Sequence, residues 1–253
     1  MTRTPLLAGN WKMHGSRAEA IALASALVDA VGSERQREVM LAPPFTALEA
    51  VAAVLTGSTI KLGAQNVHWA TKGAFTGEVA APMLLEAGCS HAIIGHSERR
   101  QHFGETDETV RQRVTAALGA GLVPVVCVGE TLEQHEGGET SSVVTRQLRA
   151  GLHGLEPIGL GRCVVAYEPV WAIGTGKTAT PEQAEEVHAL IRQQLGQAAG
   201  TDIAEGIRIL YGGSVKPDNV DMLMAQPNID GALVGGASLD AESFTRIVRF
   251  ERR

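Results

Sequence analysis

The stretch Val164–Thr178, VVAYEPVWAIGTGKT, decides how the rest of the chain is interpreted. It opens with an apolar run that ends at Glu168, and it continues through Trp171 to two glycines, Gly174 and Gly176. Parallel α/β folds place their chemistry at the carboxyl ends of strands, where this carboxylate stands. A lone acid beside a proline is ordinarily a solvated turn residue. The functional interpretation of Glu168 therefore depends on whether the rest of the chain supplies such a fold.

Eight short apolar runs recur along the chain, each too short for a helix and too continuous for a half-exposed strand. They are PLLAGN from Pro5, EVMLA from Glu38, IKLGA from Ile60, HAIIG from His91, LVPVVCV from Leu122, CVVAYE from Cys163, IRILYG from Ile207 and DGALVG from Asp230. Helical patterns lie between them, and no Pro/Gly/Ser-rich linker divides the chain. We predict an α/β fold, a closed (β/α)8 barrel of the TIM type, with residues 1–253 as a single domain. A doubly wound open sheet is the alternative, although its G-x-G-x-x-G fingerprint does not follow the first strand.

Several predicted helices carry recognisable ends. The predicted N-terminal caps are Ser16 with Glu19, Thr46 with Glu49, Thr106, and Thr180 with Pro181 and Gln183. Pro82 and Gly88 mark the start and end of another helix, and Gly121 ends the one that follows Thr106. Further helical patterns cover residues 142–152, 217–224 and 241–251.

The composition supports this fold and narrows the partners. The chain has 253 residues, of which 44% are hydrophobic and 4% aromatic, so its core is mainly aliphatic, as in parallel α/β proteins. A formal charge of −6 without a basic run argues against a nucleic-acid partner, so an anionic ligand must be held locally. Cys89, Cys127 and Cys163 are odd in number and widely spaced, which disfavours disulfides and a zinc site. With no signal-peptide or membrane-span pattern, we expect a soluble cytoplasmic protein without a membrane partner.

In a barrel, the residues that follow each strand converge on one mouth. The polar and glycine residues at these positions are Asn10, Lys12, His96, Ser97, Glu98, Glu168, Gly212, Gly213, Ser214, Gly235 and Gly236. Each alone has an ordinary explanation, as a solvated lysine, a structural histidine or a tight turn. Their joint position at strand ends favours a functional site.

The glycines at this mouth predict a phosphate site. Gly235 and Gly236 precede a predicted short helix, and glycine backbone can approach a phosphate closely enough to donate N–H groups to it. Ser214 and the N–H groups of Gly174 and Gly213 can complete this anion nest. The predicted ligand is a small phosphorylated molecule.

Glu168 and His96 fit the abstraction of a proton next to a carbonyl group. The helix predicted to begin near Ser97 directs its positive end toward His96, which disfavours imidazolium. A neutral ring can donate to the carbonyl oxygen while the carboxylate takes the proton, and Lys12 and Asn10 can stabilise the charge that develops. No third partner stands at a metal-ligand spacing, so we expect neither a metal nor a cofactor.

Six segments resemble triosephosphate isomerase, in that family's order along the chain. They are NWKM at Asn10–Met13, QNVHWATKGAFTGE at Gln65–Glu78, IIGHSERR at Ile93–Arg100, AYEPVWAIGTGKTA at Ala166–Ala179, YGGSV at Tyr211–Val215 and LVGGASL at Leu233–Leu239. The resemblance implies an isomerase that interconverts D-glyceraldehyde 3-phosphate and dihydroxyacetone phosphate through an enediolate, in glycolysis and gluconeogenesis. That enzyme is itself a standard example of paired acid–base tuning, so the roles below are taken from the family.

The resemblance implies one role for each matching residue. Glu168 is the base that moves the proton, and His96 is the neutral electrophile that polarises the oxygens. Lys12 and Asn10 bind the substrate and stabilise the enediolate. Glu98 is similar to the family's acidic neighbour of the lysine, either in a supporting role or in a structural salt bridge.

A closing lid and a homodimer are implied in the same way. The lid residues are Pro169, Val170, Trp171, Ala172, Ile173, Gly174, Thr175, Gly176, Lys177, Thr178 and Ala179, and lid closure excludes water. The segment 65–78 resembles an arm that inserts into a second subunit. The interface residues implied are Gln65, Asn66, Phe75, Thr76, Gly77 and Glu78.

Two other classes of function stay open. A phosphosugar aldolase of the barrel class could use Lys12 as a Schiff-base nucleophile, which borohydride trapping would reveal. No lysine ends a central strand, however, and Glu168 would then be idle. A non-catalytic binding or adhesion protein could use the same scaffold, but it would not need every residue at the mouth.

Overall fold

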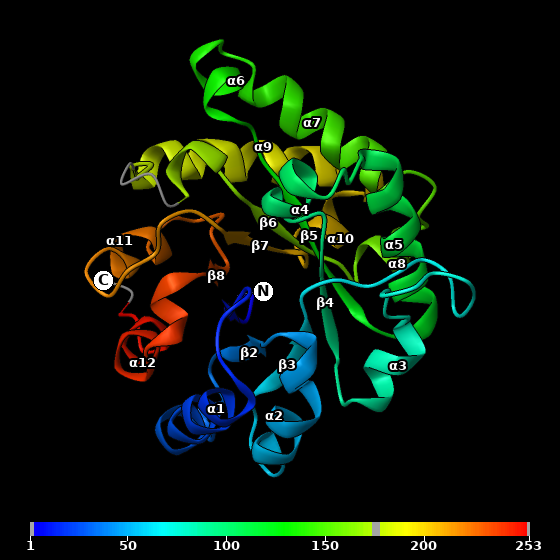
Figure 1. Cartoon of the computed structure of the whole chain (residues 1–253). Coiled ribbons are helices and arrows are strands. Elements are labelled where there is room, and N and C mark those ends of the chain that lie inside the picture. The colour runs from blue at the N-terminus through cyan, green and yellow to red at the C-terminus, as the bar shows by residue number, and fades with distance from the viewer. Residues whose placement is uncertain (1–2, 174–177, 252–253) are drawn as a thin grey trace.

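The computed structural model describes residues 3–173 and 178–251, which form a closed barrel of eight parallel strands surrounded by helices (Figure 1). The strands are β1 (Leu6–Asn10), β2 (Glu38–Ala42), β3 (Lys61–Ala64), β4 (His91–Ile94), β5 (Val123–Val128), β6 (Val164–Tyr167), β7 (Arg208–Tyr211) and β8 (Gly231–Val234). Strand β1 pairs in parallel with both β2 and β8, which closes the barrel. The predicted α/β class and (β/α)8 barrel are confirmed, and each apolar run contains one strand.

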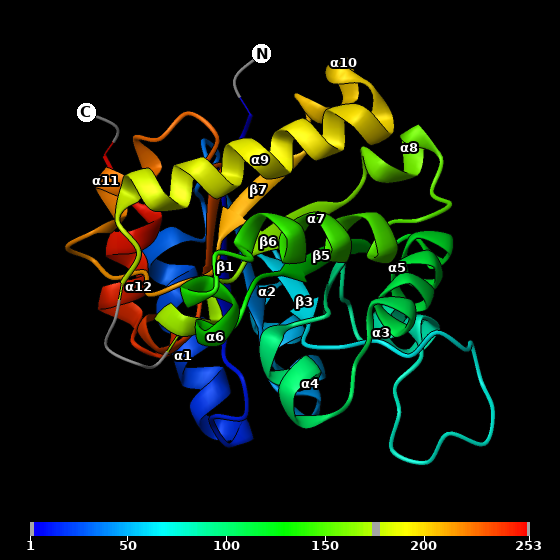
Figure 2. The same ribbon diagram turned by 90° about the horizontal axis from the view of Figure 1, so that it is seen from above.

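The helices lie outside the ring of strands, as the view along the barrel and the perpendicular view both show (Figures 1 and 2). They are α1 (Arg17–Val31), α2 (Leu48–Leu55), α3 (Ala81–Glu86), α4 (Ser97–His102), α5 (Asp107–Ala120), α6 (Leu132–Glu136), α7 (Thr140–Gly151), α8 (Pro157–Leu160), α9 (Pro181–Ala199), α10 (Thr201–Ala204), α11 (Val220–Met224) and α12 (Ala241–Val248). Three single turns of 3₁₀ helix complete the described elements, η1 (Phe45–Ala47), η2 (Val170–Ala172) and η3 (Gly236–Leu239).

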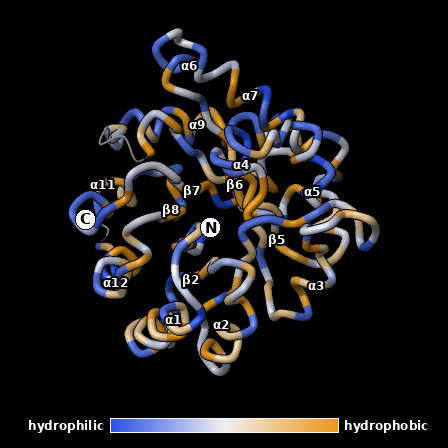
Figure 3. The backbone as a smooth tube through the Cα atoms, in the orientation of Figure 1, coloured by the Kyte–Doolittle hydropathy of each residue, from blue (hydrophilic) through white to orange (hydrophobic). Residues whose placement is uncertain are grey.

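Each strand is buried on both faces, which explains why the apolar runs are continuous. On β1, Leu6 and Ala8 belong to a cluster of side chains inside the barrel, whereas Leu7 belongs to the larger core between strands and helices. Hydrophobic residues, in orange, accordingly mark the strands at the centre of the ring (Figure 3). Burial of one such leucine contributes roughly 1.5–3 kcal/mol, so this double core holds the strand ends that form the mouth.

Three of the four predicted N-terminal caps are confirmed. Ser16, Thr106 and Thr180 each accept a hydrogen bond from the backbone N–H three residues on, in reciprocal capping boxes. The prediction at Thr46 is wrong, because Thr46 lies inside the η1 turn and Ala47 precedes α2 without a side-chain cap. The extra 3₁₀ turn moves the true start of the helix beyond the capping signature.

The helix ends differ from the predictions at several places. Residues 217–224 were predicted as one helix, but α11 starts only at Val220, because Lys216 and Asn219 close a turn before it. The last helix ends at Val248, since Arg249 leaves the helical conformation and Phe250 is buried in the core. The short helices α6, α8 and α10 have no predicted counterpart.

Three observations concern the classes of protein considered above. All three cysteines are free and buried. Within residues 3–173 and 178–251, no helix has both the length and the apolar character of a membrane span, and no group of three metal-ligating side chains occurs.

Candidate active site

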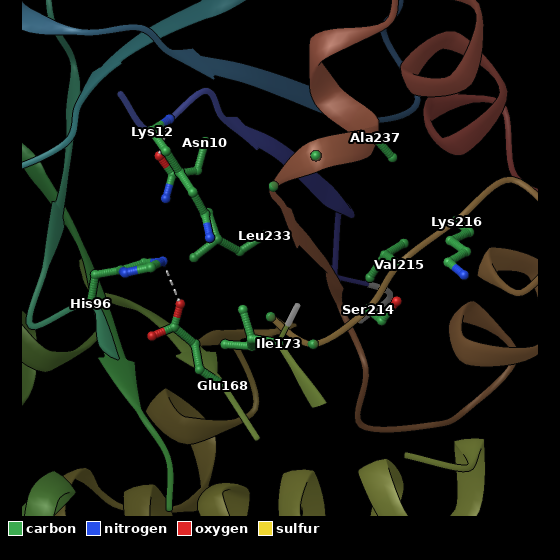
Figure 4. A pocket seen from close by; sticks show the side chains of 14 residues that line it. Asn10, Lys12, His96, Glu168, Ile173, Ser214, Val215, Lys216, Leu233 and Ala237 are labelled. Atoms are coloured by element: carbon green, nitrogen blue, oxygen red, sulfur yellow. Dashed lines mark hydrogen bonds and ion pairs between the residues drawn. The ribbon is translucent and has the colours of Figure 1, made fainter. Parts of the chain in front are cut away.

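A cavity of about 370 Å³ lies at the carboxyl ends of the strands, where the sequence placed the chemistry (Figure 4). Its lining residues are Asn10, Lys12, His96, Glu168, Ile173, Gly212, Gly213, Ser214, Val215, Lys216, Leu233, Gly235, Gly236 and Ala237. The structure thus brings the predicted acid–base pair, the cation and the glycine turns to one space. Gly174, predicted to donate to the phosphate, lies outside the described residues.

Glu168 stands at the end of β6 and is almost completely buried, with 2% of its surface exposed. Its carboxylate accepts a hydrogen bond from the backbone N–H of Ser97 at 2.8 Å and lies 2.9 Å from His96 Nε2. Burial raises the pKa of Glu168, but His96, the Ser97 N–H and Lys12 together lower it further, so the net direction is downward. The group is therefore an ionised carboxylate held against a proton donor.

Two glycines give Glu168 the room it occupies. A Cβ atom on Gly129 would lie 1.8 Å from the backbone oxygen of Glu168, and one on Gly212 would lie 2.8 Å from its Cγ. No side chain fits at such distances, so the close approach of these backbones requires glycine. The sequence argument did not single out Gly129, because its only signal is a position just after β5.

His96 links the carboxylate to the first turn of α4. The backbone N–H of Glu98 donates to His96 Nδ1 at 3.2 Å, and a ring nitrogen that accepts a hydrogen bond carries no proton. Burial lowers the pKa of His96, while the Glu168 carboxylate and then Glu98 raise it, with a net upward direction. In this arrangement the hydrogen bond nonetheless favours a neutral ring whose proton lies on Nε2 and points at Glu168.

Lys12 has an unusual backbone. Among the described residues it is the only one other than glycine with a positive φ, 52°, a conformation that residues with a Cβ rarely adopt. Two side chains hold it there, since the Lys12 N–H donates to Asn10 Oδ1 at 3.1 Å and Gln65 Nε2 donates to the Lys12 carbonyl at 2.7 Å. The ammonium lies 2.5 Å from Glu98 Oε1. Gln65, predicted only as an interface residue, thus positions the cation within its own subunit.

The glycine turns after β7 and β8 line the same cavity. Gly213 must be glycine, because a Cβ there would lie 2.2 Å from the hydroxyl oxygen of the buried Tyr211. Gly235 precedes η3, and the Ser238 hydroxyl donates to its carbonyl at 2.7 Å, which fixes the turn. Backbone amides at such a turn suit an anion.

Comparison with known proteins agrees with this geometry. The family model described as triosephosphate isomerase matches residues 5–251. The chain belongs to the triosephosphate isomerase family. Among curated relatives, the triosephosphate isomerase of Moorella thermoacetica is 57% identical over 250 residues, covering 99% of this chain and 100% of the relative. That of Roseiflexus sp. (strain RS-1) is 56% identical over 248 residues, covering 98% of each.

A solved structure agrees as well. The crystal structure of triosephosphate isomerase from Bartonella henselae superposes with a TM-score of 0.87 at 43% identity, covering 96% of this chain and 97% of that one. The present chain is therefore an isomerase built on the same barrel. All six segments that carried the resemblance contribute described residues that line the cavity or contact a lining residue.

The described part of the predicted lid segment is anchored by a buried carboxylate. Glu130, fully buried, accepts hydrogen bonds from Trp171 Nε1 at 2.8 Å and from the Tyr167 hydroxyl at 3.0 Å. His135 stacks on Trp171 with ring centroids 4.3 Å apart. Sequence analysis missed Glu130 and His135, because contacts between the β5 and β6 loops are set only by the closed barrel. Residues 174–177 of the predicted lid lie outside the described part.

The arm predicted to reach a second subunit extends away from the barrel, in cyan at the lower right of Figure 2. Phe75 at its tip is 43% exposed, although it packs against His68. At the base of the arm, Asn66 Oδ1 instead accepts a hydrogen bond from Arg113 Nη1 of the same chain, at 2.5 Å. The arm therefore has an anchored base and an exposed apolar tip.

Proposed function

We propose that this member of the triosephosphate isomerase family interconverts D-glyceraldehyde 3-phosphate and dihydroxyacetone phosphate by proton transfer through an enediolate. One observation carries the proposal. The buried Glu168 carboxylate and the Nε2 atom of His96 face one cavity that is also lined by the glycine turns at Gly213 and Gly235. A small substrate that carries both a phosphate and a carbonyl group fits this combination of groups.

Glu168 acts first, as the base. Its carboxylate removes a proton from the carbon next to the carbonyl, and the electrons of that C–H bond form the C=C bond of the enediolate. The carbonyl π electrons move to the oxygen. The same carboxylate then returns the proton to the former carbonyl carbon. The hydroxyl proton moves to the former carbonyl oxygen through His96 Nε2, which gives its proton to one oxygen and takes one from the other, so no atoms are consumed or released.

His96 acts on the carbonyl and hydroxyl oxygens of the substrate. In the substrate-free structure its Nε2 proton lies against Glu168 at 2.9 Å, and we expect a bound carbonyl oxygen to replace the carboxylate as the acceptor. The carboxylate charge is what raises the pKa of His96, and that charge is neutralised once Glu168 has taken the substrate proton. The His96 ring is therefore not driven to take up an additional proton while it donates its Nε2 hydrogen bond to the substrate oxygens.

Lys12 and Asn10 support the charge that develops. The Lys12 ammonium is held by Glu98 at 2.5 Å and lines the same cavity as His96. A fixed cation in a site that excludes water stabilises an enediolate oxygen without reorganising during the reaction. Glu98 has a supporting role, because it orients the ammonium and does not line the cavity itself.

Three further assignments complete the proposal. Residues 169–179 form a lid that closes over the bound substrate and excludes water. The enzyme works as a homodimer, with Gln65, Asn66, Phe75, Thr76, Gly77 and Glu78 at the interface. It acts in the cytoplasm, in glycolysis and gluconeogenesis, and uses no cofactor, metal or nucleic acid.

A coupled assay of D-glyceraldehyde 3-phosphate conversion tests the reaction and its base together. We expect an active wild type, an inactive but folded Glu168→Ala variant, and normal activity in Glu49→Ala, which changes an exposed glutamate of α2. A folded wild type without activity would refute the proposed reaction. Trapping of Lys12 by borohydride with substrate would instead support the aldolase.

A further inference from the structure

Lys216 is a second cation at the mouth of the cavity, and the mechanism above does not use it. It follows Val215 in the segment between β7 and α11 and lies on the side of the cavity that carries Ser214, away from His96 and Lys12 (Figure 4). Its side chain is exposed. Within the described part of the chain, its ammonium has no hydrogen bond or ion pair.

The backbone of Lys216 is fixed even though its side chain is free to extend. Its N–H donates to Asn219 Oδ1 at 2.8 Å, and its carbonyl accepts from the Asn219 N–H at 3.2 Å. The same asparagine donates through Nδ2 to the Ser214 carbonyl at 2.9 Å. This turn holds the backbone of Lys216 beside the turn at Gly213. The lysine ammonium is therefore within reach of the rim of the cavity next to the predicted phosphate position.

Within residues 3–173 and 178–251, the other charged groups around the cavity do not supply a free cation for an incoming phosphate. The Lys12 ammonium is already paired with Glu98 at 2.5 Å, and Glu168 adds a negative charge at the floor. The chain as a whole carries −6. Without another cation, an approaching phosphate would meet a mouth with more negative than positive charge among the described residues. Asp218, the nearest acid in sequence, is exposed and does not line the cavity.

We propose that Lys216 steers the phosphorylated substrate into the cavity. Its charge attracts the phosphate toward the turns at Gly213 and Gly235, so that the substrate enters with its phosphate on that side and its reacting carbons toward Glu168. The phosphate is then held by backbone amides, and the lysine acts mainly on approach. This inference rests on the proposed function, because it assumes a phosphorylated substrate.

Charge steering changes kcat/KM and leaves kcat nearly unchanged. For Lys216→Gln we expect kcat/KM to fall about fivefold at low ionic strength, the order of effect of one charge at a cleft that focuses its field. The deficit should shrink as salt is added, since the screening length is about 10 Å at 0.1 M ionic strength. Lys216→Arg, which keeps the charge, should retain near wild-type kcat/KM.

The matched control is Lys61→Gln. Lys61 is exposed at the first position of β3, at the opposite end of the barrel, and its loss changes the net charge by the same amount. We expect wild-type kcat/KM for this variant at every salt concentration. An equal fall in both variants would show an effect of net charge alone and would overturn the assignment to Lys216.

Binding of inorganic phosphate separates this inference from the proposed reaction. Titration calorimetry at low salt should show weaker phosphate binding in Lys216→Gln, by a factor of about five, and no change in Lys61→Gln. This measurement works even if the wild type has no isomerase activity, in which case only the proposed reaction fails. Phosphate binding and kcat/KM that are unchanged in Lys216→Gln at low salt, or a deficit that high salt does not reduce, would refute the steering role.

Discussion

At the scale of single residues, the proposed acid–base pair is held by backbone amides as well as by its own contact. The Ser97 N–H donates to Glu168 and the Glu98 N–H donates to His96, so the first turn of α4 fixes both groups before substrate binds. Because these groups are already in place, little of the substrate's binding energy is needed to order them. The rate should therefore respond strongly to changes that keep the polarity of a group but alter its geometry.

Replacing His96 with glutamine tests the electrophile. The amide can still donate a hydrogen bond, but it cannot exchange protons with the oxygens, so we expect kcat to fall about 100- to 10,000-fold. Steady-state kinetics measures the change, and circular dichroism checks the fold. His102→Gln, at the exposed end of α4, serves as the control. Near-normal turnover in a folded His96→Gln protein would return His96 to a structural role.

The sequence was sufficient to predict which residues meet at the site, but not how their backbones are held there. Glu168, His96 and Lys12 each follow a strand, and barrel closure alone brings such positions together. The positive φ of Lys12 and its hydrogen bond from Gln65 depend on a contact between loops 53 positions apart. Local pattern contains no information about such a contact.

At the scale of elements, prediction succeeded where the signal was local and strong. Strands buried on both faces give continuous apolar runs, and reciprocal capping boxes mark α1, α5 and α9. It failed for α6, α8 and α10, which have four or five residues and bury too few side chains to show a period. It also failed at Thr46, where a 3₁₀ turn comes before the helix.

The cap of α5 carries a stability prediction. Thr106 accepts a hydrogen bond from the Thr109 N–H and starts a helix of 14 residues, so Thr106→Ala should lower the free energy of unfolding by about 1 kcal/mol. Urea denaturation measures this difference. The control is Thr201→Ala. Thr201 is exposed and is not an N-cap, because Gly200 caps α10. Equal stabilities of the two variants would show that the cap contributes nothing measurable.

At the scale of the whole molecule, the two ends of the barrel differ in chemistry. The amino ends of β2, β4 and β7 carry Glu38, His91 and Arg208, and Glu38 Oε1 lies 3.3 Å from His91 Nε2 and 3.2 Å from Arg208 Nη1. The His91 ring, and then Arg208, lower the pKa of Glu38 to about 2 against the opposing effect of burial. This end of the barrel thus links strands that are far apart in sequence through charge.

The depressed pKa of Glu38 predicts a stability that depends on pH. A carboxyl whose pKa is lower in the folded state stabilises the fold above its unfolded pKa, and this contribution is lost as pH falls toward the folded value of about 2. Between pH 5 and about pH 3, the free energy of unfolding of Glu38→Gln should fall less steeply than that of the wild type. Urea melts across this range measure both slopes, with Glu49→Gln as the control. Parallel slopes would contradict the assignment to Glu38.

We also expect the active form to be a dimer. The tip of the arm exposes Phe75, so replacing residues 75–77 with serines should produce monomers with little activity. Sedimentation and turnover are measured together. Ile158→Ser, which changes another exposed apolar residue on α8, should leave both unchanged. A fully active monomer would refute the dimer requirement.

Barrel closure has a consequence for how copies of this chain can associate. Because β1 pairs with both β2 and β8, no strand of the described barrel has a free edge. Open sheets recruit other chains by extending their hydrogen-bond ladder from such an edge, and this route is closed here. Association must instead proceed through side chains and projecting loops, which makes recognition between subunits a matter of shape and sequence rather than of backbone pairing.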